Sequence, residues 1–344
     1  MAKVLSSVDV AGPLVYYLQS GNLNFVIGSG ASYPAIALAG NIESELDKLL
    51  DAGNSTEANV LALDFVQGIE FDNQVMTMGS EAGDWKQTLK HYSDFLLTLD
   101  QILFRRKSNL LPRQANIFTT NYDTFFEEAA GRAASIILND GFDRTSSQSG
   151  NFKFAPERYF DRTYRSGAVY TRQAEVPSIN LIKLHGSLTW RKTNTGIRYT
   201  TKNIEKIDLT GEFDVEQVEN SLSKRALVLP TAKKHGSTVM DRTYYDLLRL
   251  YANSLEAENA ILVAFGFSFC DKHLREVTLR ALRNPTSQMI VFAFNADAVA
   301  WYEEIFESTR NIIVVAPPEN EVIDFEALTN ILGAAIASEG EAVE

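Results

Sequence analysis

Short apolar segments alternate with helical patterns along the sequence, and this alternation limits the folds that are open to the chain. Most of the apolar segments are rich in Val, Ile and Phe and apolar on both faces, as buried parallel strands are. Between them, apolar residues recur at steps of three and four, which predicts amphipathic helices. The apolar segments cover residues 23–27, 115–118, 180–184, 226–229, 260–265, 289–294 and 311–315, and the clearest helical patterns cover residues 86–106, 122–133 and 271–282. We therefore expect an α/β fold with a Rossmann-like, doubly wound and mostly parallel sheet.

Three regions depart from this alternation. Residues 43–112 indicate a helical insertion, residues 189–223 a small insertion with short strands and one helix, and residues 140–177 a long, partly mobile loop. The length of 344 residues is enough for one large domain. We expect a single domain over residues 1–344 with a core made of residues 12–42, 113–188 and 224–338.

Charge and cysteine content exclude several classes of protein. A net charge of −12 disfavours direct binding of nucleic acid, because the chain as a whole repels a polyanion. The single cysteine, Cys270, excludes an internal disulfide and a zinc site built on four cysteines. Its apolar neighbours predict a small buried side chain. No apolar run reaches the roughly 20 residues of a membrane-spanning helix, and the first residues lack a signal-peptide pattern. We therefore expect a cytoplasmic protein.

The first apolar segment ends in a glycine-rich turn, GSGAS at residues 28–32. In doubly wound sheets, a turn of this kind after the first strand faces the pyrophosphate of a dinucleotide. Tyr33 replaces the third glycine of the dehydrogenase fingerprint, and the nearest acidic residues come early, on a helical stretch. The alternative is a tight turn that binds no ligand.

Polar side chains and glycines also follow other apolar segments, at the carboxyl edge where α/β sheets bind their ligands. They are Asn121 and Asp123 after the second segment, His185 after the third, Gly266 and Ser268 after the fifth, and Asn295 after the sixth. Because the carboxyl ends of parallel strands meet at one edge, this set predicts a functional site there.

Each polar side chain of this set also has a structural alternative. Asn121 would be an N-cap if the next helix begins near residue 122, and Asp123 would then be a first-turn carboxylate that complements the helix dipole. A lone histidine is usually a structural hydrogen-bonding group, although His185 leaves the core where the ligand edge is expected. His235, in a second His-Gly-Ser triplet, follows a proline and two lysines in a loop, which favours the structural alternative there.

Four motifs together resemble the signature set of the sirtuin-like NAD-consuming enzymes. They are GSGAS at 28–32, TTNYD at 119–123, KLHGS at 183–187 and GFSFCD at 266–271, in family order. Sirtuin deacylases carry Gly-Ile-Pro-Asp-Phe-Arg after the first glycine loop, where this chain has YPAIALAG. They also usually carry four zinc-binding cysteines after the His-Gly motif, in a module that supports the channel for an acyl-lysine peptide. This chain has none there, so the resemblance implies no metal and disfavours peptide deacylation.

The helical insertion and the replaced loop are similar instead to the sirtuin-like domains of bacterial anti-phage systems. This resemblance implies an NAD⁺ hydrolase that cleaves the nicotinamide–ribose bond and depletes the NAD of an infected cell. Because an unregulated NAD hydrolase would kill its host, we expect a homo-oligomer or a partner to control it. The resemblance includes two-gene systems whose partner is a HerA-like hexameric ATPase. We expect nucleic acid to be reached only through a partner, and no membrane contact.

The residue types at the predicted edge suit this reaction. Loss of nicotinamide leaves an oxocarbenium-like centre, as in glycoside cleavage, and requires a fixed ribose, a placed water and a base. We expect His185 to be the base, since a histidine ordinarily has a pKa of about 6.5. Asn121 would hold the ribose or the water through its neutral amide, and Asp123 would brace the site.

The expected NAD contacts come from the same motifs. Backbone N–H groups of the glycine turn and one hydroxyl would face the pyrophosphate, and the resemblance implies that the later motifs receive the adenosine half. These contacts are Gly28, Ser29, Gly30, Ala31 and Ser32 for the pyrophosphate, Gly266, Ser268 and Asn295 for the adenosine, and Thr120 as a further contact. Two alternatives stay open: an NAD or ADP-ribose sensor without turnover, and a protein deacylase or ADP-ribosyl transferase.

Overall fold

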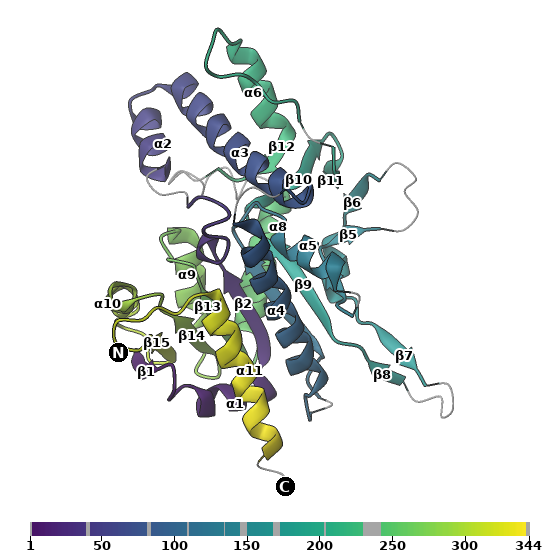
Figure 1. Cartoon of the computed structure of the whole chain (residues 1–344), viewed down its shortest axis with the longest axis vertical. Coiled ribbons are helices and arrows are strands. Elements are labelled where there is room, and N and C mark those ends of the chain that lie inside the picture. Colours follow the sequence, from purple (N-terminus) through teal and green to yellow (C-terminus); the bar gives the residue numbers. More distant parts are fainter. Residues whose placement is uncertain are drawn as a thin grey trace.

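The computed structural model describes residues 2–38, 42–80, 84–108, 110–133, 135–144, 150–167, 173–202, 204–229 and 242–341. Within these ranges, eight strands form one sheet in which all neighbours are parallel (Figure 1). In spatial order they are β1 (Lys3–Ser6), β15 (Ile312–Ala316), β14 (Gln288–Phe292), β13 (Ala260–Phe265), β2 (Asn22–Ile27), β3 (Gln114–Thr119), β9 (Ser178–Lys183) and β4 (Leu138–Asn139).

This strand order is that of a doubly wound sheet. From β2 the chain builds one side of the sheet through β3 and β9, and it then crosses to β13 and builds the other side through β14 and β15. The point where the direction reverses lies between β2 and β13, which is where such sheets bind ligands. The predicted α/β class and the Rossmann-like parallel sheet are confirmed.

Helices cover both faces of the sheet, which explains why most positions of its central strands are buried and apolar. On β13, Ile261, Val263 and Phe265 pack on one face, while Leu262 and Ala264 pack on the other. The first face, in front in Figure 1, carries α1 (Ala11–Ser20), α4 (Trp85–Phe104), α5 (Phe125–Arg132) and α11 (Phe325–Glu341). The second face carries α8 (Arg242–Glu256), α9 (Lys272–Ala281) and α10 (Ala296–Ile305).

A second, antiparallel sheet stands above the first one in Figure 1. Its five strands within the described ranges are β12 (Arg225–Leu227), β10 (Gly186–Thr193), β11 (Gly196–Tyr199), β6 (Phe152–Phe154) and β5 (Phe142–Asp143). The helices α2 (Ile42–Asp51), α3 (Ser55–Thr77) and α6 (Val215–Lys224) lie beside it. The apolar segment 226–229, which the sequence did not distinguish from the parallel strands, contributes β12 to this sheet.

The region expected to be a long loop, residues 140–177, carries regular structure in its described part. It holds β5 and β6, a 3₁₀ helix at Pro156–Phe160, and a hairpin of β7 (Tyr164–Ser166) and β8 (Gln173–Glu175) that projects from the body (Figure 1). Aromatic packing accounts for β5 and β6: the ring of Phe142 lies 5.3 Å from that of Phe154 and 5.4 Å from that of Trp190. The expectation of a loop was therefore wrong for this part.

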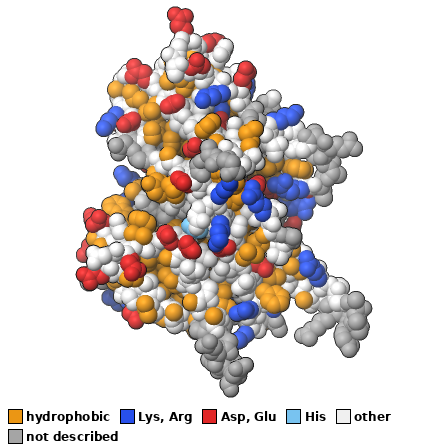
Figure 2. Space-filling model, viewed as in Figure 1, with side chains coloured by type: hydrophobic (Ala, Val, Ile, Leu, Met, Phe, Trp, Pro, Cys, Tyr) orange, Lys and Arg blue, Asp and Glu red, His pale blue; other side chains and the backbone are white. Residues whose placement is uncertain are grey.

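The region expected to be a helical insertion is helical in its described part. The described residues of 43–112 form α2, α3 and α4, and α4 packs against α5 and α11 on the main sheet. No helix in the described part of the chain is both long and apolar enough to cross a membrane. Figure 2 shows charges of both signs on one face of the molecule, with acidic side chains gathered over α10.

Candidate functional site

Two glycine loops meet at the point where the sheet reverses direction. The backbone N–H of Gly28 donates to the carbonyl of Phe265 at 3.0 Å, and that of Gly30 donates to the carbonyl of Gly266 at 3.2 Å. Within the first loop, the N–H of Ala31 donates to Gly28 at 3.1 Å and that of Ser32 to Ser29 at 3.0 Å. The N–H groups of Gly28, Gly30 and Ala31 thus bind backbone carbonyls, and their expected donation to a pyrophosphate would require these bonds to break.

A cavity of about 550 Å³ opens beside these loops. Most residues of the predicted site line it together: Ser29, Gly30, Ser32, Thr120, Asn121, Asp123, His185, Gly266 and Ser268. Gly28 and Ala31 are buried behind the loop surface. Asn295 does not line the cavity; it is the N-cap of α10, and its Oδ1 accepts from the backbone N–H of Ala298 at 2.9 Å.

The other walls come from segments that the sequence did not connect with the site. Leu38, Glu43, Phe65 and Ile69 line the cavity from the α2–α3 side, and apolar residues of β14 and α10 line it from the opposite side. Cys270 is exposed and lines the cavity, so the prediction of a buried core cysteine was wrong. His235 lies outside the described residues.

Asn121 is a buried side chain whose amide is held on one side only. Its Nδ2 donates to the carbonyl of Gly28 at 3.1 Å and to Oγ of Ser32 at 3.0 Å. A carbonyl oxygen can only accept, which fixes the orientation of the amide. Its Oδ1 has no hydrogen-bond partner among the described residues. Because α5 begins at Phe125, with Thr124 at the N-cap position, the alternative of Asn121 as a helix cap was wrong.

Ser32 connects three side chains beneath the cavity. Its hydroxyl donates to Oδ2 of Asp123 at 2.8 Å, since a carboxylate only accepts, and it lies 2.7 Å from the hydroxyl of Tyr92. Burial and the nearby Asp123 raise the pKa of Tyr92 well above its ordinary value, which keeps Tyr92 a donor. Ser32 thus donates once and accepts twice, from Asn121 and Tyr92, and its hydroxyl is fully used inside the protein.

Lys183 ties the Asn121–Asp123 loop to the strand that leads to His185. The side chain of Lys183 is 2% exposed, and its ammonium group bonds to the backbone carbonyl of Asp123, to Oγ of Ser187 at 3.2 Å and to Oε1 of Glu127 at 2.9 Å. These acceptors match the three protons of the ammonium group. Burial raises the pKa of Glu127, and the charge of Lys183 partly opposes this rise.

His185 lies at the turn between β9 and β10, where its Nε2 is 3.2 Å from Oδ2 of Asp271. Asp271 also lines the cavity, but the sequence analysis gave it no role. Its position directly before a helix, within the GFSFCD motif, was the available signal.

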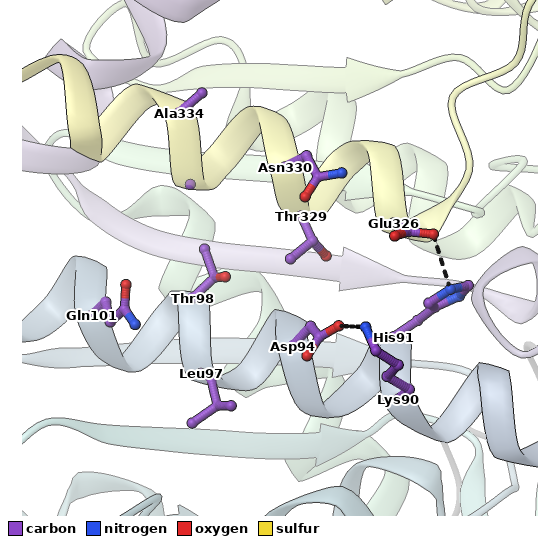
Figure 3. Close-up of a pocket in the computed structure, with 11 residues that line it drawn as sticks. Lys90, His91, Asp94, Leu97, Thr98, Gln101, Glu326, Thr329, Asn330 and Ala334 are labelled. Atoms are coloured by element: carbon purple, nitrogen blue, oxygen red, sulfur yellow. Dashed lines mark hydrogen bonds and ion pairs between the residues drawn. The ribbon is translucent and has the colours of Figure 1, made fainter.

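A second hollow of about 510 Å³ lies between α4 and α11 (Figure 3). Its charged side chains pair with one another: Lys90 with Asp94 at 2.6 Å and His91 with Glu326 at 3.4 Å. None of the four motifs contributes to its lining, and we assign it no ligand.

Residues 115–314 match the family described as SIR2-like domain, which is more than half of the chain. The chain therefore belongs to the SIR2-like family. A solved structure titled as Sir2Tm bound to a propionylated peptide is similar to it at 12% identity, over 96% of this chain and 98% of that chain, with a TM-score of 0.37. No curated protein gives a significant match.

Membership of the SIR2-like family implies an NAD-dependent activity, with NAD as the molecule bound. The cavity described above lies within the volume range of small-molecule sites, about 300–1,000 Å³. Among the described residues, no group of three or more His, Cys, Asp or Glu side chains is placed to hold a metal ion.

Proposed function

We propose that this protein is an NAD⁺ glycohydrolase, which cleaves the nicotinamide–ribose bond and releases nicotinamide and ADP-ribose. The observation that carries this proposal is Oδ1 of Asn121, which accepts no hydrogen bond from any residue that the structure describes. A buried acceptor without a donor is costly, so it indicates that a ligand or a water completes the site. Asn121 lines the same cavity as His185, at the edge where doubly wound sheets bind their ligands.

The side chains suit hydrolysis in the following way. Asn121 accepts a hydrogen bond from the attacking water or from a ribose hydroxyl through Oδ1. His185 takes the proton of the water as its oxygen bonds to the ribose carbon, and the electron pair of the broken bond leaves with neutral nicotinamide. Asp123 does not contact the substrate in this proposal. It accepts a hydrogen bond from Ser32, and Ser32 accepts one from the amide of Asn121.

For NAD itself, we propose that the exposed loop residues Ser29 and Gly30 contact the pyrophosphate, with Thr120 nearby. Gly266 and Ser268 would receive the adenosine half. Gly28, Ala31 and Asn295 would act through the backbone and the α10 cap that they form. We also propose that residues 43–112 and 189–223 are insertions into one SIR2-like domain.

We propose further that the activity depletes NAD in anti-phage defence, by abortive infection. The sequence supports this role through its replaced cofactor loop and its lack of zinc-binding cysteines. Because unregulated NAD hydrolysis would kill the host, we propose that a homo-oligomer and a HerA-like hexameric ATPase control it, and that nucleic acid acts only through that partner.

The experiment measures nicotinamide release from NAD by the purified protein, alone and with a HerA-like hexameric ATPase. The variants are His185→Ala and Asn121→Ala. The matched controls are His91→Ala and Asn330→Ala, in the hollow between α4 and α11. Release by wild type and controls, but by neither site variant, supports the proposal. NAD binding without release under either condition would favour a sensor, and release by both site variants would place the chemistry elsewhere.

A further inference from the structure

His185 and Asp271 form a pair in the cavity wall, although they come from separate motifs. The Nε2 of His185 lies 3.2 Å from Oδ2 of Asp271, and their side chains are 10% and 13% exposed. A carboxylate only accepts hydrogen bonds, so its place beside Nε2 favours a proton on that nitrogen. The pair therefore restricts both the orientation and the tautomer of the imidazole.

Asp271 is itself held by the start of α9. Its Oδ1 accepts from the backbone N–H groups of His273 at 3.1 Å and Leu274 at 3.3 Å. This is an N-cap arrangement, which fixes the side chain and places its negative charge at the positive end of the helix. One carboxylate oxygen thus caps the helix while the other meets His185, and the helix start sets the position of the ring.

We propose that Asp271 is the positioning residue of His185, an inference that rests on the proposed function. With its proton held on Nε2, neutral His185 presents the lone pair of Nδ1 as the base. The water proton moves to Nδ1 as the water oxygen bonds to the ribose carbon and nicotinamide leaves with the electrons of the broken bond. Asp271 stabilises the resulting imidazolium, the role that a buried carboxylate has in Ser-His-Asp triads.

The variant Asp271→Asn tests this role without removing the helix cap. Its amide oxygen still accepts from the helix N–H groups, but the negative charge is lost and the amide N–H favours the opposite tautomer of His185. We expect kcat for nicotinamide release to fall on the order of 10²-fold, with KM changed less than about threefold. A raised KM with unchanged kcat would overturn the proposal.

The matched control is Asp214→Asn. Asp214 is also an N-cap, of α6, and its Oδ1 accepts from the backbone N–H of Glu216 at 2.9 Å. It does not line the cavity. We expect kcat and KM of this variant to equal those of the wild type, and an equal loss in both variants would mean that helix capping alone explains the effect.

A spectroscopic readout separates this inference from the proposed function. The chain has four histidines, so ¹⁵N-histidine NMR can report the tautomer of each ring, with His185→Gln assigning one signal. We expect His185 to carry its proton on Nε2 in the wild type and to change tautomer in Asp271→Asn. An unchanged His185 signal in that variant refutes the positioning role even if NAD is hydrolysed. A changed signal in a protein that releases no nicotinamide upholds the role and rejects the proposed function.

Discussion

Gly28 and Gly266, which follow neighbouring strands of the sheet, are in direct backbone contact. A Cβ atom on Gly28 would lie 2.2 Å from the carbonyl oxygen of Gly266. Gly266 also has a φ of +60°, which side chains rarely adopt. The close packing of the two loops beside the cavity therefore requires glycine at both positions, whether or not a ligand binds there.

We expect Gly28→Ala to lower the free energy of unfolding by about 3 kcal/mol, because backbone on both sides cannot yield to the added methyl group. Gly68→Ala is the control, since Gly68 lies in α3 with nothing within 4 Å of an added Cβ. There alanine should stabilise by about 0.5–1 kcal/mol. Urea unfolding of both variants checks this, and equal stability of Gly28→Ala and wild type would contradict the close contact.

Glu127 predicts a pH dependence of stability. Because burial raises its pKa in the folded protein, this carboxyl binds a proton more tightly when folded than when unfolded. Its contribution to stability is therefore present below its ordinary pKa of 4.5 and is lost as the pH rises through the folded value. Unfolding of wild type and Glu127→Gln between about pH 4 and about pH 7 should show wild type losing stability relative to the variant. A difference that does not change with pH would disagree.

The ion pair between Arg225 of β12 and Glu70 of α3 joins this helix to the smaller sheet, and we expect it to contribute to stability. Arg225 is 2% exposed and meets Glu70 through two hydrogen bonds of 2.9 and 2.7 Å. Glu70→Gln leaves a buried guanidinium without its counter-charge and should cost about 3 kcal/mol. Asp94→Asn, which removes the exposed partner of Lys90, should change stability little. Denaturant unfolding compares the two, and similar small effects would refute a structural role for the Arg225 pair.

Cys270 offers a direct test of where NAD binds. It is the single cysteine, it is exposed, and it lines the cavity, so alkylation by iodoacetamide reports on this wall alone. If NAD covers the wall, a concentration of ten times its Kd should slow labelling about tenfold. Mass spectrometry of the intact protein measures the rate. Labelling at the same rate with and without NAD would place the dinucleotide elsewhere.

Sequence patterns predicted the main sheet because most positions of its central strands are apolar on both faces, as burial between two layers of helices favours. The smaller sheet was missed in part because strands as short as Phe142–Asp143 and Phe152–Phe154 are too short to show an alternation of apolar and polar residues. Their partners are aromatic side chains distant in the sequence, such as Trp190.

The site was predictable as an edge of polar residues but not as a set of contacts. The choice between cap and site for Asn121 depended on where α5 begins, and helix boundaries are poorly encoded in sequence. Cys270 was misread because two buried residues, Phe267 and Phe269, alternate in this loop with the exposed positions Ser268 and Cys270. The pairing of Asp271 with His185 depends on how the sheet is ordered, which no local pattern states.

The position of β13 between β2 and β14 has a consequence for synthesis of the protein. The loop that follows β13 supplies one wall of the cavity and also Asp271, and both come late in the chain. A nascent chain on the ribosome that has not yet passed residue 271 has the first glycine loop and His185 but no closed cavity. Under the proposed function, translation products that end before residue 271 would lack the complete site, so the proposed activity would begin only after most of the chain has been made.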